Sequence, residues 1–291
     1  MKNIFIVTDF SAASHNAAIY GVELAKQFGA KLFLFHAYQV PVQIPESYIF
    51  YSTEDVWKKI KELLQNEALA IDPERTIEIE LCGGVGAAAH TIIEHAEAAK
   101  ADLIICGMKE TVKGLRRIFG STTISLTRLS KIPFLVIPED ARFKKPAHIA
   151  LASDMDSETA AETVTLLKEF GKTFKSELSV VWVVENEEDE AYKRKFLPEG
   201  ITKHLKEMEP RFEFPTGKTI ATALENFAKD NSIDMMAIIP HKHTFMERFF
   251  VESTTTSVIF HTHVPLLVLP QKKHSEKKEG VNSHSLNESL K

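Results

Sequence analysis

The chain repeats itself, and this duplication constrains the fold more than any other feature of the sequence. Four short apolar segments of the first half return in the same order in the second half. Residues 3–9 return as 148–154, 31–37 as 177–183, 102–106 within 233–239, and 132–138 as 264–270. The last pair keeps a proline near each end in both copies. A repeat of this length indicates two copies of one folding unit.

Within the first copy, apolar segments alternate with helical patterns. The expected strands are residues 3–8, 31–37, 77–81, 102–106 and 132–138. The expected helices are a segment that ends at Gly29, residues 53–69, residues 87–99, and a segment from Ser121 to about Ser130. The glycines of residues 83–86 predict a turn between the third strand and its helix. Because nearly all the strands are apolar throughout, we expect a parallel sheet covered on both faces, which is a doubly wound α/β fold.

The length of 291 residues accommodates two domains with a sizeable core each. We place the first domain at residues 1–139 and the second at 146–270, with a short polar linker between them. Residues 271–291 are polar and without periodicity, which predicts a disordered tail. The segment 38–52, rich in aromatic residues, is too long for a simple connection. Two roles are open for this segment. It is either a lid or partner surface, or a loop that packs on its own aromatic rings.

Composition narrows the class of protein. The net charge of −5 argues against a nucleic-acid-coating surface, which would need a basic excess. No apolar run approaches the length of a membrane span, and the first residues do not form an export signal, so we expect a soluble cytoplasmic protein. Cys82 and Cys106, the only cysteines, have no metal or redox spacing and are expected to be small buried thiols.

The segment after the fourth strand has the composition of a phosphate-binding loop. An apolar run ends at Gly107, a basic loop with further glycines follows, and Gly120-Ser121-Thr122-Thr123 then begins a helix. Free N–H groups and the helix dipole favour an anion at such a place, and the hydroxyls can bind it or cap the helix. In a doubly wound sheet this position faces the end of the first strand, so Asp9 is expected to accept bonds from a ribose or an adenine amine. The alternative role for Asp9 is the N-cap of the first helix. His36 and Ala37 would lie beside the base.

These segments together resemble the universal stress protein family over residues 1–270. The resemblance rests on the strand that ends at Thr8-Asp9, the strand 102–107, the helix start Gly120–Thr123 and the closing strand 132–137. It implies five-stranded parallel sheets of order 3-2-1-4-5, Rossmann-like and similar to adenine nucleotide alpha hydrolases. It also implies that fifth strands pair antiparallel, which would make the two domains an internal pseudo-dimer; a homodimer of whole chains stays open.

Members of this family that bind ATP carry a glycine, two residues, a glycine, nine residues, a glycine, and then serine or threonine. Gly107 and Gly120 fit the first and third glycines, but Glu110 stands at the second. Glutamate adds a Cβ and a negative charge there, which nearby lysines and arginines could offset. The residues expected around an adenine nucleotide are Thr8, Asp9, Phe10, Ser11, His36, Ala37, Gly107, Met108, Lys109, Gly120, Ser121, Thr122 and Thr123.

The second copy departs further from this pattern. Pro240 replaces the first glycine, His243 lies near the second and Glu252 replaces the third, while Asp154 and Ser253-Thr254-Thr255 are retained. Proline has no N–H to donate and Glu252 would repel phosphate, so we expect no nucleotide there. His241-Lys242-His243 and His261-Thr262-His263 could suggest metal binding, but the two pairs flank different elements, and we expect no metal site.

Three functions remain to be compared. The first is a stress-response protein that binds ATP or a related adenine nucleotide in the first domain and interacts with partners in a nucleotide-dependent way. The second is a nucleotide-free interaction scaffold. An enzyme is the third, and we expect none beyond slow ATP hydrolysis, because residues 8–12 lack the loop of adenylylating relatives and no catalytic set emerges.

Overall fold

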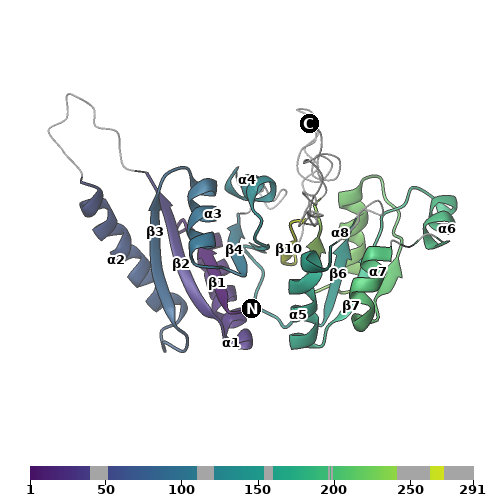
Figure 1. Ribbon diagram of the computed structural model, residues 1–291, viewed down its shortest axis with the longest axis horizontal. Coiled ribbons are helices and arrows are strands. Elements are labelled where there is room, and N and C mark those ends of the chain that lie inside the picture. The colour runs from purple at the N-terminus through teal and green to yellow at the C-terminus, as the bar shows by residue number, and fades with distance from the viewer. Residues whose placement is uncertain are drawn as a thin grey trace, which may run out of the picture.

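The computed structural model describes residues 1–39, 52–109, 121–153, 160–195, 197, 199–240 and 263–271. Among these residues, ten strands form one continuous sheet of order β3-β2-β1-β4-β5-β10-β9-β6-β7-β8. The first half of the chain builds one side of this sheet and the second half the other (Figure 1). Each half therefore has the strand order 3-2-1-4-5, and the predicted doubly wound α/β class is confirmed.

The first half contains β1 (Asn3–Val7), α1 (Ala12–Phe28), β2 (Lys31–Tyr38), α2 (Thr53–Ile71), β3 (Ile79–Val85), α3 (Ala88–Ala98), β4 (Leu103–Met108), α4 (Ser121–Leu129) and β5 (Phe134–Pro138). Its strands pair in parallel. Local chemistry sets the helix ends: Ser11 caps α1, and Gly29 ends it with a left-handed φ of 60°, which glycine adopts without strain. Ser52 accepts from the Asp55 N–H at the start of α2.

The second half contains β6 (His148–Ala152), α5 (Thr165–Phe174), β7 (Glu177–Val181), α6 (Glu187–Lys195), α7 (Glu199–Leu205), β8 (Arg211–Glu213), α8 (Ile220–Asp230), β9 (Met235–Ile238) and β10 (Leu266–Val268), with short 3-10 helices at Ala161–Val164 and Lys206–Met208. Strand β8 is an addition to the prediction, which named no third strand in this half. Its Arg211-Phe212-Glu213-Phe214 alternation is the pattern that could have indicated it.

Two apolar layers cover the two faces of the sheet, and each layer runs through both halves. One contains Tyr20 of α1, Leu64 of α2 and Phe170 of α5. The other contains Ile92 of α3, Leu126 of α4 and Leu224 of α8. Each layer thus receives helices from both copies, which is the arrangement that a doubly wound duplicate predicts.

The two halves meet at β5 and β10, which pair antiparallel. The register places Leu267 opposite Leu135, and both side chains are fully buried. A second contact joins α1 to α5, where the ring of Phe28 lies 5.4 Å from that of Phe170 and 5.6 Å from that of Phe174. Two apolar strand edges that would otherwise be exposed therefore cover each other.

The duplication extends to single hydrogen bonds. The Oδ2 atom of Asp102 accepts from the backbone N–H groups of Lys2 and Asn3 at the start of β1. In the second half, Oδ2 of Asp234 accepts in the same way from Ala147 and His148 at the start of β6. Each aspartate fixes the first strand of its half to the fourth, which explains why the two copies share this residue at the same place.

The linker between the halves is held by Asn16 of α1, a residue that is 8% exposed. Its Nδ2 donates to the carbonyl oxygens of Pro138 and Ala141, at 3.0 and 2.8 Å, and its Oδ1 accepts from Arg142 at 2.7 Å. A buried side chain that serves three linker groups fixes the path of the chain between the two halves.

Replacing Asn16 with leucine should therefore destabilise the protein. We expect a loss of about 1–3 kcal/mol in the free energy of unfolding, because the three hydrogen bonds of this buried side chain are lost. Urea denaturation measures it. Asn16→Asp keeps the shape and the acceptor for Arg142 but turns a carboxylate oxygen toward the two carbonyls, so a loss of stability in this isosteric variant would assign the effect to the Nδ2 donors. Wild-type stability in Asn16→Leu would contradict this role.

The predicted turn at residues 83–86 is wrong in part. Gly83 and Gly84 continue β3 and pair with His36 and Ala37 of β2, so the chain turns only after Val85. Glycine is needed there for close packing: a Cβ on Gly83 would lie 2.2 Å from the Trp57 ring, and one on Gly84 would lie 2.4 Å from the Thr91 methyl. Glycine in a strand often marks such a close approach, so a pair of glycines does not by itself indicate a turn.

The two cysteines differ in exposure. Cys106 is buried as predicted, whereas Cys82 on β3 is only partly buried. Burial raises the pKa of the Cys82 thiol to about 11, with the Glu80 charge adding to the effect. Burial raises the pKa of Cys106 to about 12. Both thiols are therefore protonated at neutral pH.

Alkylation of the folded protein at pH 8 should consequently be slow. We expect Cys82 to react about a hundred-fold more slowly than a free thiol, because its thiolate is depleted to that extent, and Cys106 to react only after unfolding. Mass spectrometry of iodoacetamide-treated protein measures both. Cys82→Ser provides the control, and rapid labelling of Cys106 in that folded variant would contradict its burial.

Candidate functional site

The carboxyl end of β1 carries a network of short polar side chains. Thr8, which is 2% exposed, lies with its Oγ1 3.2 Å from the Oγ of Ser14 and accepts from the Phe10 N–H at 3.0 Å. Ser14 Oγ also accepts from the Asp9 N–H and donates to the carbonyl of Ser11. This network fixes the turn between β1 and α1 and holds Phe10 at a φ of 60°, which is uncommon for a residue with a Cβ.

The Asp9 carboxylate projects from this turn. One oxygen accepts from the N–H and hydroxyl of Ser11, and the other lies 2.8 Å from Nζ of Lys109 at the end of β4. Partial burial raises the pKa of Asp9, but the hydrogen bonds from Lys109 and Ser11 outweigh it and hold that pKa far below its usual range. Asp9 is therefore ionised at every physiological pH. The alternative in which Asp9 caps the first helix is wrong, since Ser11 is the N-cap.

Two helix amino ends meet the carboxyl end of β4. A Cβ on Gly107 would lie 2.4 Å from the carbonyl oxygen of Ala13 and 2.8 Å from the nitrogen of Ser14, so only glycine lets the first turn of α1 approach the strand. On α4, Oγ1 of Thr123 lies 3.9 Å from Sγ of Cys106. The first turns of α1 and α4 thus flank the same strand end, where both helix dipoles favour a negative charge.

The carboxyl end of β2 borders the same crevice on the other side of β1. Nδ1 of His36 lies 2.7 Å from the carbonyl oxygen of Thr8, and the His36 ring is 4.7 Å from the ring of Phe10. A carbonyl can only accept, so Nδ1 carries a proton. Ala37 follows and pairs with Gly84 of β3. Polar and aromatic groups from β1 and β2 therefore adjoin the strand end of β4, in the crevice that a doubly wound sheet predicts.

The predicted site residues have different roles in this crevice. Asp9, Lys109 and Ser121 are exposed, while Phe10, Ser11, His36, Ala37, Gly107 and Thr122 are partly exposed. The side chains of Thr8, Met108 and Thr123 are buried and can contribute only through the backbone or by supporting neighbours. Gly120 and Glu110 lie outside the described residues, as does the aromatic segment from Val40 to Tyr51.

Ser14 is the residue of this site that the sequence prediction omitted. It bonds to Thr8, Asp9 and Ser11 and thereby connects β1, the turn and α1. Its spacing of three residues from the N-cap Ser11 is the signal that could have found it, because an N-cap hydroxyl and the third helical residue lie together.

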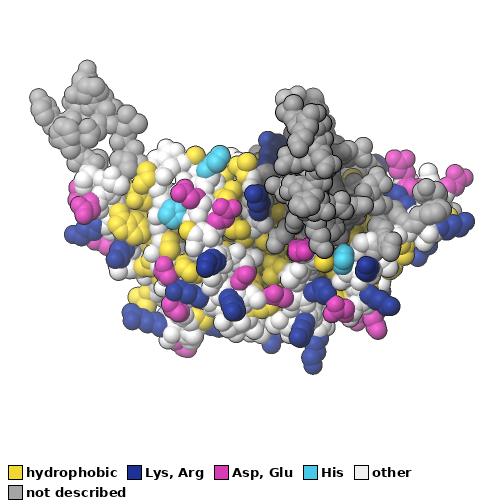
Figure 2. All heavy atoms as spheres, in the orientation of Figure 1, with side chains coloured by type: hydrophobic (Ala, Val, Ile, Leu, Met, Phe, Trp, Pro, Cys, Tyr) yellow, Lys and Arg dark blue, Asp and Glu magenta, His cyan; other side chains and the backbone are white. Residues whose placement is uncertain are grey.

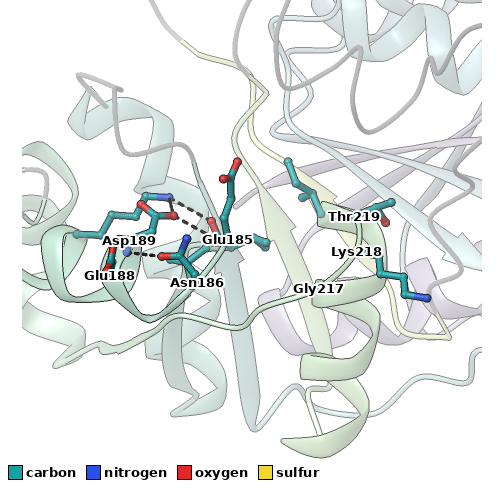
Figure 3. Close-up of a pocket in the computed structure, with 11 residues that line it drawn as sticks. Glu185, Asn186, Glu188, Asp189, Gly217, Lys218 and Thr219 are labelled. Carbon is teal, nitrogen blue, oxygen red and sulfur yellow. Dashed lines mark hydrogen bonds and ion pairs between the residues drawn. The ribbon is translucent and has the colours of Figure 1, made fainter.

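The second half has a hollow in a different place. It lies beyond the end of β7, has a volume of about 760 Å³ and is lined by residues near α6 and by the loop that leads to α8. Figure 3 shows Glu185, Asn186, Glu188 and Asp189 on one side and Gly217, Lys218 and Thr219 on the other. Its polar side chains bond to other groups of the protein: Asn186 accepts from the Asp189 N–H, Asp189 pairs with Lys193, and Thr219 caps α8.

The sequence assigns several residues to the crevice of the second half. Among them the structure describes only Pro240, which follows β9 and is partly exposed. Asp154, His243, Glu252 and Ser253–Thr255 lie outside the described residues, and so do three of the four histidines in the His-x-His pairs. Within the described part of the chain, no three potential ligands gather as a metal site would require. His263 lies 3.7 Å from the carboxylate of Asp140.

Two further observations concern the distribution of charge on the surface and the composition of the helices. Acidic and basic side chains are interspersed over the face drawn in Figure 2, whereas a nucleic-acid footprint gathers basic ones. Among the described helices, none has the length and apolar composition needed to cross a bilayer.

Comparison with known proteins identifies the family. The sequence profile described as the universal stress protein family matches residues 1–138 and, a second time, residues 147–270. The chain belongs to the universal stress protein family. A universal stress protein of Methanocaldococcus jannaschii is 32% identical over 146 residues, which cover 47% of this chain and 81% of that protein. The resemblance inferred from the strand ends and the Gly120–Thr123 helix start is thus confirmed.

Solved structures agree on the fold. A universal stress protein from Archaeoglobus fulgidus superposes with a TM-score of 0.67 at 17% identity, over 93% of this chain and 98% of that chain. A protein of unknown function from Pseudomonas aeruginosa PAO1 has a TM-score of 0.58 at 13% identity, over 93% of each chain. At these identities the likeness shows the fold alone, and it extends over both halves of this chain.

Proposed function

We propose that the first half of this universal stress protein binds ATP or a related adenine nucleotide, and that the bound nucleotide alters its interactions during stress. The observation that carries the proposal is the meeting of two helix amino ends at Gly107, beside the ionised Asp9 and the cation of Lys109. Helix ends and a lysine suit phosphates, and a carboxylate suits ribose hydroxyls. The proposal places the protein in the cytoplasm, where ATP is present.

Binding rather than turnover is the proposed activity. A general base works best with a pKa near the operating pH, and the pKa of Asp9 is held far below that range by its hydrogen bonds. Ser11 and Ser14 are bonded within the turn, which gives them a structural role. The crevice is therefore suited to holding a nucleotide without activating water efficiently.

The antiparallel contact between β5 and β10 supports a further part of the proposal. We infer that each chain is an internal pseudo-dimer of its two halves. Since each fifth strand already has a partner on both sides, a homodimer of whole chains would need another surface. The two copies could then respond as one body to a nucleotide held by the first.

Ser121→Glu tests the nucleotide proposal. A carboxylate at the first residue of α4 suits the helix dipole but repels phosphate, so ATP affinity should fall by at least about ten-fold while the fold persists. Isothermal titration calorimetry measures it. Leu129→Glu adds the same charge to the exposed far end of α4 and should bind like wild type.

The second candidate function is a nucleotide-free interaction scaffold. It is favoured by the pairing of Asp9 with Lys109, which satisfies the carboxylate without any ligand. If wild-type protein binds no adenine nucleotide, the scaffold function replaces the first. If ATP binds and Ser121→Glu binds it equally well, the nucleotide lies elsewhere and the assigned crevice is wrong.

A further inference from the structure

The ion pair between Asp9 and Lys109 spans the crevice. Nζ of Lys109 lies 2.8 Å from Oδ2 of Asp9, and the two side chains are 59% and 56% exposed. The pair joins residues 100 positions apart in sequence, one after β1 and one after β4. It therefore closes together the two strand ends between which a doubly wound sheet binds its ligand.

The partners of Asp9 differ in how readily they can be displaced. Ser11 belongs to the turn that caps α1, and its N–H and hydroxyl are fixed on one carboxylate oxygen by that turn. Lys109 reaches the other oxygen on a flexible, exposed side chain. Since Ser11 already fills both acceptor positions of Oδ1, a ribose that brings two hydroxyls to Asp9 needs both positions of Oδ2 and competes with Lys109 for one of them, while the contact with Ser11 stays.

Lys109 is also placed to meet phosphate once displaced. It follows Gly107 by two residues, and the first turns of α1 and α4 flank that strand end. The lysine ammonium is a point charge on a four-carbon stem, which can turn from one anion to another nearby without moving the backbone. The same residue can therefore neutralise Asp9 in the empty crevice and a phosphate in the occupied one.

We propose that Lys109 is an exchangeable counter-ion which makes this crevice select nucleotides by their number of phosphates. The inference rests on the proposed function and adds its specificity. A nucleoside must displace Lys109 from Asp9 and offers the ammonium nothing in return. A nucleotide displaces it and supplies an anion, and a triphosphate supplies the most charge. Because the pair is exposed, its own attraction is weak, about five-fold or less in affinity, so phosphate wins the exchange.

The test compares adenosine, AMP and ATP by calorimetry at low ionic strength. Wild-type protein should bind them with affinity rising in that order. In Lys109→Met, adenosine should bind as well as before or up to about five-fold more tightly, because the competing ammonium is gone. ATP should bind about ten-fold more weakly, because a charged hydrogen bond to phosphate is lost. The preference for ATP over adenosine then falls by about ten- to fifty-fold.

Two further variants serve as controls. Lys109→Arg keeps the charge and should keep the preference for phosphates. Lys131→Met removes an exposed lysine before β5, at the opposite end of the strands, and should leave all three affinities unchanged. Equal losses for adenosine and ATP in Lys109→Met, or no change in either, would overturn the exchange while leaving the nucleotide function intact. If wild type binds none of the three, both proposals fail together.

Discussion

Replacing Leu135 with alanine should destabilise both halves of the protein to the same extent. Leu135 is fully buried and lies opposite Leu267 across the antiparallel contact of β5 with β10. Removing three carbons from such a site costs about 2–5 kcal/mol in the free energy of unfolding. Since the sheet is continuous through this contact, the loss should be felt on both sides of it.

The chain offers one fluorescent reporter for each half. Trp57 lies on α2 and Trp182 follows β7, and they are the only tryptophans. Urea denaturation of the single-tryptophan variants Trp57→Phe and Trp182→Phe, each with and without Leu135→Ala, therefore follows the two halves separately. We expect coincident transitions that shift together. A shift seen by Trp57 alone would show that the halves unfold independently.

Two controls separate the contact from general core damage. Leu135→Met keeps the volume and should cost less than about 1.5 kcal/mol. Leu267→Ala should match Leu135→Ala, and the double variant should lose less than the sum of the two, because the residues are opposite each other. Full additivity would contradict the direct contact.

Replacing Gly107 with alanine should have the second large effect. The added Cβ would lie 2.4 Å from the carbonyl oxygen of Ala13, a backbone atom that cannot turn aside as a flexible side chain can. The first turn of α1 must then move away from β4, at a cost of about 1–3 kcal/mol or more. Urea denaturation measures the change, and wild-type stability would contradict the close approach.

Met108→Leu is the matched control for this substitution. It changes the next residue of β4, which is 1% exposed, without changing the volume much, and it should cost less than about 1.5 kcal/mol. Gly107→Ala should also lower ATP affinity, since α1 carries Ser11 and Ser14, which position Asp9. Stability and binding should therefore change together in this variant and neither should change much in the control.

The sequence predicted the strand order and the duplicate architecture because both follow from local patterns and a family resemblance. Apolar strands, the cap at Gly29 and the repeated prolines around β5 and β10 are all readable without contacts. The turn assigned to Gly83-Gly84 was wrong because the reason for glycine there is Trp57, a residue 26 positions earlier in the chain. No local pattern carries that information.

The residues of the candidate site likewise divide into those with a local sequence signal and those that depend on distant contacts. Asp9 and Gly107 were found from their places after strands, which is a local signal. The pairing of Asp9 with Lys109 was not, because the adjacency of β1 and β4 does not say where the Lys109 ammonium lies. Ser14 was missed for a different reason: its spacing of three residues points to it only once Ser11 is known to be the N-cap, and the sequence offered Asp9 for that role.

The covalent joining of the two halves has a consequence for how the contact between β5 and β10 can change. In a symmetric assembly of identical subunits every substitution occurs twice, and each edge must match itself. Here Phe134 faces Val268 and Val136 faces Leu266, so the two edges are already unlike. Substitutions in one half can therefore accumulate independently of the other half. Because one chain carries both, the two halves are always present in a one-to-one ratio.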